Sequence, residues 1–242
     1  MVNNDLEFTG ERMVPGKTDS ALLMEHLARY RFALDYASGK IVLDAACGSG
    51  YGTYMLSTKA ESVTGIDISI KAIEYCKSNY PQGNAEFKVA DILNLPFKDN
   101  SFDLVVAFEI FEHLESPREM LIELKRITRR KIMLSTPNAD YEKSTVVNPH
   151  HVREYCLAEF SDILESVFKG DFEVTGQFPT SKTSGLKKAY MKAKRKLGVG
   201  PIFKKPMMAV INPQDLMTIT LPYEFKSDNL KNAEFFISMI EL

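Results

Sequence analysis

The stretch VLDAACGSGYG, residues 42–52, constrains the fold of this chain more than any other. An apolar run ends there in a turn that holds three glycines, Gly48, Gly50 and Gly52. Glycine permits a tight turn and lets a ligand approach the backbone closely. Such a turn between a strand and a helix is typical of α/β sheets that bind ligands at the carboxyl ends of their strands.

Apolar runs and helical periodicity alternate along the rest of the chain. Predicted strands cover residues 40–46, 61–68, 85–92, 102–109, 131–137, 171–179 and 233–242, and predicted helices cover residues 20–36, 51–58, 69–80, 116–128 and 153–168. Alternation of this kind predicts a mostly parallel sheet that is covered by helices on both faces. Right-handed crossovers then give a doubly wound sheet.

Composition is that of one α/β domain, because the chain has 242 residues and 45% of them are apolar. No apolar run is long enough to span a bilayer, and the N-terminus lacks a hydrophobic signal core. The three cysteines show neither metal spacing nor a disulfide framework, which predicts a cytoplasmic location.

The net charge of −2 hides an uneven distribution. Residues 182–205, the basic block, carry nine Lys or Arg and no Asp or Glu, so the remainder carries −2 − 9 = −11. A block of this kind indicates an anionic partner. The alternative interpretation is a solvated segment without a partner.

Carboxylates follow three of the predicted strands. Asp44 precedes the glycine turn, whose GxGxG spacing differs from the dinucleotide pattern GxGxxG. A carboxylate there would repel a pyrophosphate and attract an ammonium group. Asp67 can bind both hydroxyls of a ribose, and Asp91 can accept from the amine of adenine, with Ile68 and Ile92 on either side of the ring. These residues predict a ligand with an amino-acid end, a ribose and an adenine.

Residues 41–138 resemble a class I S-adenosylmethionine-dependent methyltransferase. The resemblance rests on four motifs in order: VLDAACGSGYG, GIDIS, VADILNLPF and FDLVVAFEIFEHL. It implies S-adenosylmethionine as the cofactor and a seven-stranded, Rossmann-like sheet whose last strand is antiparallel beside the sixth. The residues to which it assigns cofactor binding are Asp44, Ala46, Gly48, Gly50, Asp67 and Asp91, although many members have glycine where this chain has Ala46.

On this basis residues 1–242 form a single methyltransferase domain. An N-terminal helical cap covers residues 1–38 and the cofactor-binding core covers residues 39–180. A basic insertion follows at residues 181–212, and a closing segment with the last strand covers residues 213–242.

The element EIFEHL follows the fourth strand, whose end faces the transferable methyl group in methyltransferases. If the chain turns helically after Glu109, the side chains of Glu112 and His113 share its face. Two converging carboxylates repel each other unless a proton or a cation lies between them. Two carboxylates and one imidazole suit a divalent ion such as Mg²⁺, Mn²⁺ or Zn²⁺.

Two further histidines, His150 and His151, follow the fifth strand. Together with EIFEHL they resemble two metal-dependent families, which methylate the 3′-terminal ribose of small RNAs and catechol-type ubiquinone precursors. Both families use a Glu-x-x-Glu-His element and a later histidine, and His151 matches that position better. The predicted metal ligands are therefore Glu109, Glu112, His113 and His151.

Other interpretations of these residues stay open. A neutral His150 or His151 can take the proton of the acceptor without any metal. Glu112 and His113 can instead begin a surface helix, and Glu109 can contact the cofactor. The candidate catalytic residues are Glu109, His113, His150 and His151.

The N-terminal stretches FTGERMVPG and EHLARYRFAL resemble methyltransferases that are associated with glycan and cell-envelope sugars. In this interpretation Arg12 pairs with the cofactor carboxylate and Tyr30 covers the cofactor site. Tyr30 can equally serve only to pack its helix onto the sheet.

The sequence as a whole predicts an S-adenosylmethionine-dependent O-methyltransferase that acts on a hydroxyl of a sugar, a glycan or a glycan precursor. The alternatives are an RNA ribose 2′-O-methyltransferase and a non-catalytic cofactor-binding module that recruits an anionic partner. At the basic block that partner is a lipid-linked glycan, a membrane surface or RNA. The predicted location is cytoplasmic or peripheral to a membrane.

Overall fold

The computed structural model describes residues 6, 12–15, 18, 20–81, 83–141, 148–180, 221 and 223–242, with the side chains of residues 20 and 21 excepted. The helices and helical turns are α1 (Ser20–Ala37), α2 (Tyr51–Ser57), α3 (Ile70–Asn79), η1 (Phe111–His113), α4 (Pro117–Ile127), α5 (Leu157–Phe168) and η3 (Leu230–Asn232). The strands are β1 (Ile41–Ala45), β2 (Ser62–Asp67), β3 (Ala85–Val89), β4 (Phe102–Phe108), β5 (Thr128–Pro137), β6 (Phe172–Pro179), β7 (Tyr223–Lys226) and β8 (Phe235–Glu241).

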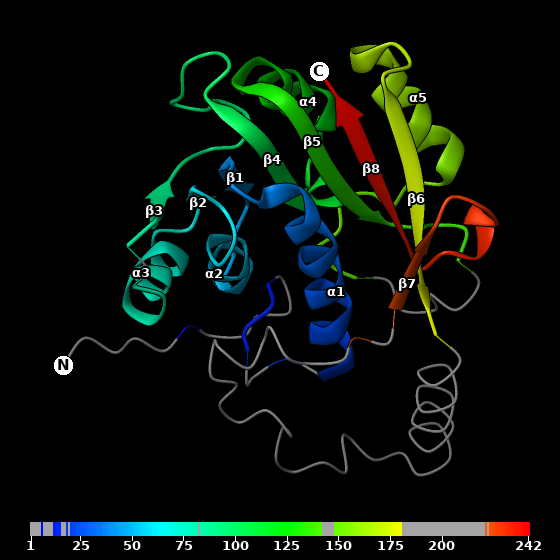
Figure 1. Cartoon of the computed structure of the whole chain (residues 1–242). Coiled ribbons are helices and arrows are strands. Elements are labelled where there is room, and N and C mark those ends of the chain that lie inside the picture. The colour runs from blue at the N-terminus through cyan, green and yellow to red at the C-terminus, as the bar shows by residue number, and fades with distance from the viewer. Residues whose placement is uncertain are drawn as a thin grey trace, which may run out of the picture.

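One sheet joins these strands in the order β3-β2-β1-β4-β5-β8-β6-β7 (Figure 1). Strands β1 to β5 are parallel, which confirms the predicted doubly wound α/β fold. Because β1 pairs with both β2 and β4, the direction of winding reverses beside it. Ligands in open sheets of this kind bind outside the carboxyl ends of the strands at that reversal.

The far half of the sheet is antiparallel. Strand β8 lies between β5 and β6 and runs against both, so the predicted antiparallel last strand beside the sixth is confirmed. The predicted number of seven strands is wrong, because β7 adds an eighth strand that pairs with β6. Strand β7 has only four residues, and its Phe225 stacks on Phe32 of α1 at 4.6 Å. Because Phe32 and Phe225 are far apart in the sequence, no local sequence pattern predicts this contact or the strand that makes it.

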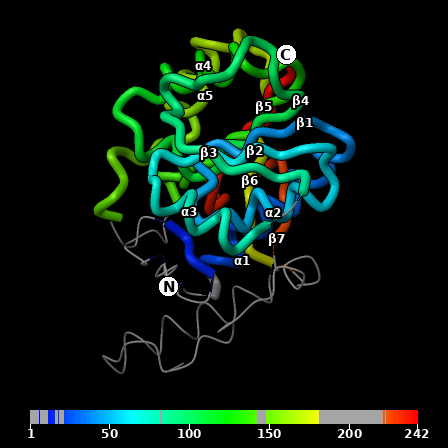
Figure 2. Tube along the Cα trace, turned by 90° about the vertical axis from the view of Figure 1, so that its left-hand side faces the viewer, coloured from blue at the N-terminus to red at the C-terminus, as the bar shows by residue number. Residues whose placement is uncertain are grey.

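Helices cover both faces of the sheet, with α1, α2 and α3 on one side and α4 and α5 on the other (Figures 1 and 2). Each layer has its own apolar core. Leu27 and Met55 belong to the first core, and Leu121 and Phe160 belong to the second. Burial on both faces explains why the central strands read as continuous apolar runs.

Most predicted elements differ from the structure by a few residues at their ends. Helix α5 begins at Leu157 and not at residue 153, because Tyr155 forms a bridge with Asn138 and Glu159 caps the backbone of Cys156. The predicted insertion 181–212, with the basic block, lies outside the described residues, and the domain boundaries stay a prediction. None of the described helices is both long enough and apolar enough to cross a bilayer.

Candidate active site

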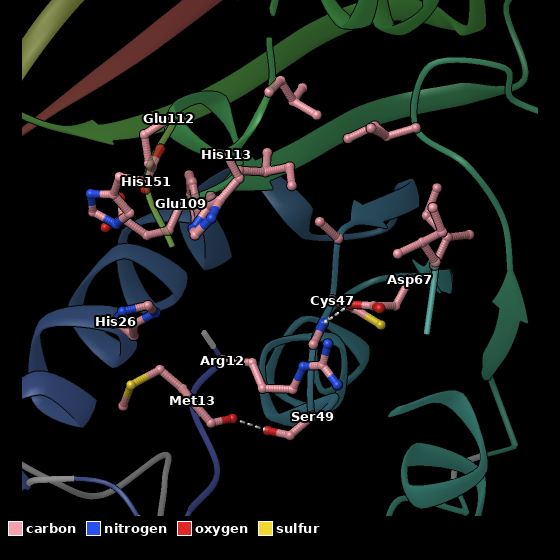
Figure 3. A pocket seen from close by; sticks show the side chains of 18 of the residues that line it. Arg12, Met13, His26, Cys47, Ser49, Asp67, Glu109, Glu112, His113 and His151 are labelled. Atoms are coloured by element: carbon pink, nitrogen blue, oxygen red, sulfur yellow. Dashed lines mark hydrogen bonds between the residues drawn. The ribbon is translucent and has the colours of Figure 1, made fainter. Parts of the chain in front are cut away.

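A cavity of about 390 Å³ opens at the carboxyl ends of the parallel strands (Figure 3). The turns after β1, β2, β3 and β4 line it, together with α1 and the loop that follows β5. Nine predicted cofactor residues lie in its wall: Arg12, Tyr30, Ala46, Gly48, Asp67, Ile68, Asp91, Ile92 and Glu109. The sheet therefore gathers residues that are far apart in the sequence around one space.

The glycine turn takes the conformation that its residues suggest. Ala46, Gly48 and Gly50 all have positive φ, at 63°, 55° and 83°. A Cβ at Gly50 would lie 2.6 Å from the sulfur of Cys76, so this position also needs glycine for packing. Gly50 precedes α2 and does not line the cavity, which corrects its predicted direct contact with the cofactor.

Asp44 lies beneath the turn and not in the cavity wall, so its predicted interaction with an ammonium group stays a prediction. It is fully buried, and its carboxylate accepts hydrogen bonds from Tyr30 Oη at 3.0 Å and Thr53 Oγ1 at 2.6 Å. Burial raises the pKa of Asp44 to about 6, although these two bonds oppose the shift. Through these two hydrogen bonds, Asp44 links α1 and α2 to the strand beneath the glycine turn.

The acids after β2 and β3 lie in the cavity wall as predicted. Asp67 accepts from the backbone N–H groups of Gly48 at 3.0 Å and Ser69 at 2.8 Å, which fixes the orientation of its carboxylate. Asp91 is exposed and accepts from the N–H of Leu93. Ile68 is 71% exposed, so an apolar side chain stands in the open beside these two carboxylates.

Arg12 and Tyr30 reach the cavity from the N-terminal region. The Nη1 of Arg12 donates to Ser69 Oγ at 3.3 Å, next to the turn that holds Asp67. Tyr30 both lines the cavity and packs α1 onto the sheet, since its ring meets Phe108 edge to face at 5.2 Å. The position of Tyr30 is therefore compatible with both predicted roles, which are to cover the cofactor site and to pack α1 onto the sheet.

Glu109 ends β4 in a left-handed conformation, with φ of 53°. Ser135 Oγ donates to its carboxylate at 2.7 Å, and the guanidinium of Arg29 lies 3.5 Å from the other oxygen. The chain does not turn helically at Glu109, because the short η1 begins only at Phe111. Glu109 is not in the group of side chains whose ligand atoms converge, and its predicted metal role stays a prediction.

Glu112 is the most deeply buried acid of the site, with no exposed surface. Thr136 Oγ1 donates to its Oε2 at 3.1 Å, whereas its Oε1 has no hydrogen-bond partner among the described residues. Burial first and the charge of Glu109 second raise the pKa of Glu112 well above its usual value. The alternative that Glu112 begins a surface helix is therefore wrong.

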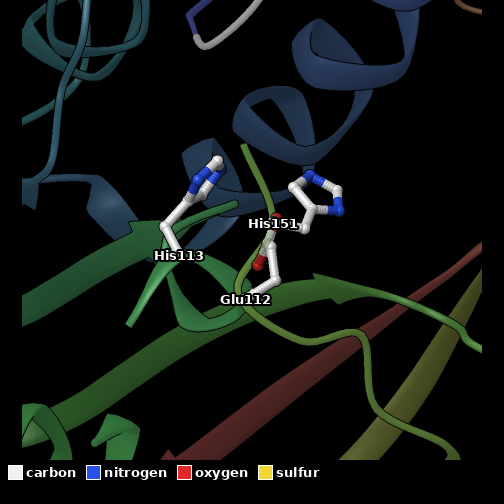
Figure 4. Close-up of side chains that lie close together, drawn as sticks. All are labelled: Glu112, His113 and His151. Atoms are coloured by element: carbon white, nitrogen blue, oxygen red, sulfur yellow. The ribbon is translucent and has the colours of Figure 1, made fainter. Parts of the chain in front are cut away.

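The imidazoles of His113 and His151 lie close to the carboxylate of Glu112 (Figure 4). Ligand atoms of Glu112, His113 and His151 all lie within 4.8 Å of one another, and we call these residues the triad. Nδ1 of His113 contacts the carbonyl of His150 at 2.9 Å, and Nδ1 of His151 contacts Glu154 at 2.8 Å. His150 is not among the residues that line the cavity, and its predicted catalytic role stays a prediction.

Several residues of the site carry no sequence motif. Arg29 is fully buried and donates to Gln177 at 2.9 Å, and His26 on the same helix lines the cavity. The sequence signal that could have identified Arg29 is the position of a charged residue on the apolar face of α1, near Leu27. Asn148 and Glu154 hold His151 but lie in a loop without periodicity.

Comparison with known proteins places this geometry in a family. A family model described as a methyltransferase domain matches residues 43–134, from β1 to β5. A protein of Mycolicibacterium smegmatis named "Probable S-adenosylmethionine-dependent methyltransferase" is 30% identical over 187 residues, which are 75% of this chain and 71% of that protein. The chain belongs to the S-adenosylmethionine-dependent methyltransferases. A relative of the same name from Mycobacterium tuberculosis is 31% identical over 179 residues, 72% of this methyltransferase and 65% of that protein.

Solved structures agree on the fold of the methyltransferase. A S-adenosylmethionine-dependent methyltransferase of Thermotoga maritima superimposes with a TM-score of 0.60 at 14% identity, covering 91% of this chain and 92% of that one. Magnesium protoporphyrin IX methyltransferase of Synechocystis, solved with bound S-adenosylhomocysteine, gives 0.54 at 20% identity and covers 69% of this chain and 84% of that one. At these identities the likeness concerns the fold alone.

Proposed function

We propose that this methyltransferase methylates a hydroxyl of a sugar, a glycan or a glycan precursor, and that the triad holds a divalent ion beside that hydroxyl. The observation that carries this proposal is the convergence of the triad on one point at the end of β4.

The donor atoms of the triad suit Mg²⁺, Mn²⁺ or Zn²⁺. Because a backbone carbonyl can only accept, Nδ1 of His113 carries the proton, and the lone pair is therefore on Nε2. The carboxylate of Glu154 contacts Nδ1 of His151, which is the usual support of a metal-bound histidine. An ion at Nε2 of His151 would displace the amide of Asn148, which lies 2.8 Å from that nitrogen. The buried Oε1 of Glu112 lacks a hydrogen-bond partner, and a cation would satisfy it.

The other side of the cavity fits S-adenosylmethionine. Its residues offer carboxylates for ribose hydroxyls and for an amine, at Asp67 and Asp91, and apolar surface for a ring at Ile68 and Ile92. Arg12 lies near enough to the turn to pair with a carboxylate. When bound, the cofactor supplies an electrophilic methyl group on a cationic sulfur.

The chemistry of the acceptor is argued from the triad and from relatives. An ion at the triad would lower the pKa of a hydroxyl placed beside it, and a vicinal diol would offer it two oxygens. An O-methyltransferase of Penicillium expansum is 37% identical over 138 residues, 54% of this chain and 48% of that protein. The sugar is proposed from the N-terminal resemblance, and the basic block is proposed to meet an anionic lipid-linked glycan or a membrane surface.

Chain residues orient the reactants. Glu109, fixed by Ser135 and Arg29, presents a carboxylate at the centre of the cavity wall. Apolar side chains such as Phe108 and Phe235 line the same space and limit the access of water. Holding the hydroxyl in line with the methyl group supplies much of the expected acceleration.

Calorimetric titration of Mn²⁺ into metal-stripped protein saturated with S-adenosylhomocysteine tests the metal site. We expect one ion per chain in the wild type and none in Glu112→Ala or His113→Ala. His150→Ala is the matched control, since it keeps the backbone carbonyl that holds His113. Binding that survives both substitutions, or no binding in the wild type, would contradict the proposal.

Transfer of a labelled methyl group to a panel of acceptors then tests the function itself. We expect labelling of sugars with vicinal hydroxyls. The triad and the basic block also favour a second candidate, an RNA ribose 2′-O-methyltransferase. Labelling of RNA ends, with an RNA affinity that falls steeply with salt, would favour that candidate instead. Cofactor binding without transfer to any acceptor would indicate the non-catalytic binding module.

A further inference from the structure

His26 lies on α1 at the wall of the cavity, below His151 in the view of Figure 3. In the sequence it reads only as one residue of the apolar helix face. The structure instead gives it a polar partner, because its Nδ1 lies 3.1 Å from Oη of Tyr51. Tyr51 is the first residue of α2, directly after the glycine turn, so His26 is tied to the element that would hold the cofactor.

The surroundings keep both members of this pair uncharged. Burial first and the positive charge of Arg29 second hold the pKa of His26 well below its usual value. Burial also raises the pKa of Tyr51 well above its usual value. His26 therefore enters the reaction as a neutral imidazole, the form that can accept a proton.

Other groups around the cavity are less suited to that task. Glu109 is held by Ser135 and by Arg29. His151 contacts Asn148 through Nε2 at 2.8 Å and Glu154 through Nδ1. His113 uses Nδ1 against a backbone carbonyl, and its Nε2 faces the proposed ion.

We propose that His26 is the general base that takes the proton of the acceptor hydroxyl, with Tyr51 fixing its ring. The inference rests on the proposed O-methyltransferase function and adds the destination of the proton. In this proposal the ring proton of His26 is on Nδ1 and is donated to Tyr51 Oη, which leaves the lone pair on Nε2. The O–H bond breaks as a proton moves to Nε2, and the oxygen forms a bond to the methyl carbon. The C–S bond breaks with its electron pair going to sulfur, and the imidazolium returns its proton to water.

The strength of this base matches the rest of the site. An imidazole with a lowered pKa is a weak base, and it removes a proton efficiently only from a hydroxyl that is itself acidified. A cation at the triad would provide that acidification in the same cavity. A neutral base also places no fixed charge beside a cationic sulfur before the reaction.

Nuclear magnetic resonance of protein labelled with ¹⁵N in histidine tests the inference without any acceptor. The chain has four histidines, so the spectrum contains four sets of ring ¹⁵N signals. The set that disappears in His26→Gln belongs to His26. With S-adenosylhomocysteine bound at pH 7.5, we expect His26 to be neutral with its proton on Nδ1. A proton on Nε2, or a charged ring, would overturn the inference, because Nε2 could then accept nothing.

Turnover gives the second readout, with catechol and methyl α-rhamnopyranoside as vicinal-diol probes. We expect His26→Gln to lower kcat by about 10²–10⁴-fold while the affinity for S-adenosylhomocysteine stays within about twofold. Added imidazole should partly restore turnover in His26→Ala, which a structural role alone would not allow. A kcat of His26→Gln within about threefold of the wild type would overturn the inference. If the wild type methylates neither probe, the proposed acceptor class has failed, and the tautomer of His26 still decides this inference.

Discussion

The two halves of the cavity are built by different means. In the cofactor half, Asp67 and Asp91 accept hydrogen bonds from backbone N–H groups, at Ser69 and Leu93 two positions further on and at Gly48 in the glycine turn. In the acceptor half, side chains hold one another over long separations, as when Arg29 meets Gln177 148 positions away. The acceptor half is also more deeply buried, since Arg29 and Glu112 expose no surface. Backbone geometry thus orients the acids proposed to bind the cofactor, whereas the acceptor half depends on buried charges that stabilise one another.

Removing the buried cation should show this dependence most strongly. Arg29→Met would leave Glu109, at 3.5 Å, and Glu112 in a buried place without a compensating charge. Breaking a buried pair costs about 3–5 kcal/mol, so we expect a loss of that size in the free energy of unfolding, measured with urea.

The matched control is Arg118→Met, which removes an exposed arginine from α4 and should change the free energy of unfolding by about 0.5 kcal/mol or less. Adding Glu109→Gln to Arg29→Met should recover part of the loss, because the unpaired carboxylate is then gone. A cost of Arg29→Met no larger than that of the control would show that the acceptor half does not depend on this charge.

Asp44 connects the two halves and should make stability depend on pH. Its pKa is about 6 in the folded protein and close to 3.8 in the unfolded chain, so the folded state binds the proton more tightly. This contribution is complete below about pH 3.8 and is lost as the pH rises through 6. At 1.36 kcal/mol per pKa unit, the wild type should lose about 3 kcal/mol more than Asp44→Asn over that range.

Urea unfolding of both proteins at a series of pH values measures this difference. Subtracting the Asp44→Asn curve removes the contribution of Glu112, whose pKa is also raised. Parallel curves for the two proteins would mean that Asp44 is not protonated preferentially in the fold.

The smallest effect belongs to the glycine turn of the cofactor half. Ala46 has φ of 63°, a conformation that costs a residue with a Cβ about 1–2 kcal/mol. Ala46→Gly removes that strain but adds freedom to the unfolded chain, so we expect a change between about 0 and 1 kcal/mol in favour of the variant. Ala158→Gly, in α5, should destabilise the protein by about 0.5–1 kcal/mol, and equal losses at both positions would contradict the account.

The difference between the cofactor half and the acceptor half also explains which features could be predicted from the sequence. The doubly wound parallel sheet, the glycine turn and the positions of Asp67 and Asp91 follow from local patterns that alternate along the chain. The contacts of Glu109 with Ser135 and Arg29 could not be predicted, because the sequence does not mark its left-handed backbone. His26 and β7 were missed because their partners lie far away in the sequence.

The central claim is that a buried acid and two imidazoles make the acceptor half a metal site. Anomalous diffraction from crystals grown with Mn²⁺ and S-adenosylhomocysteine tests it most directly. The account predicts one manganese peak within coordination distance of Oε1 of Glu112 and Nε2 of His113 and His151, with the cofactor product against Asp67. A structure with S-adenosylhomocysteine in place and no manganese between these three side chains would contradict it.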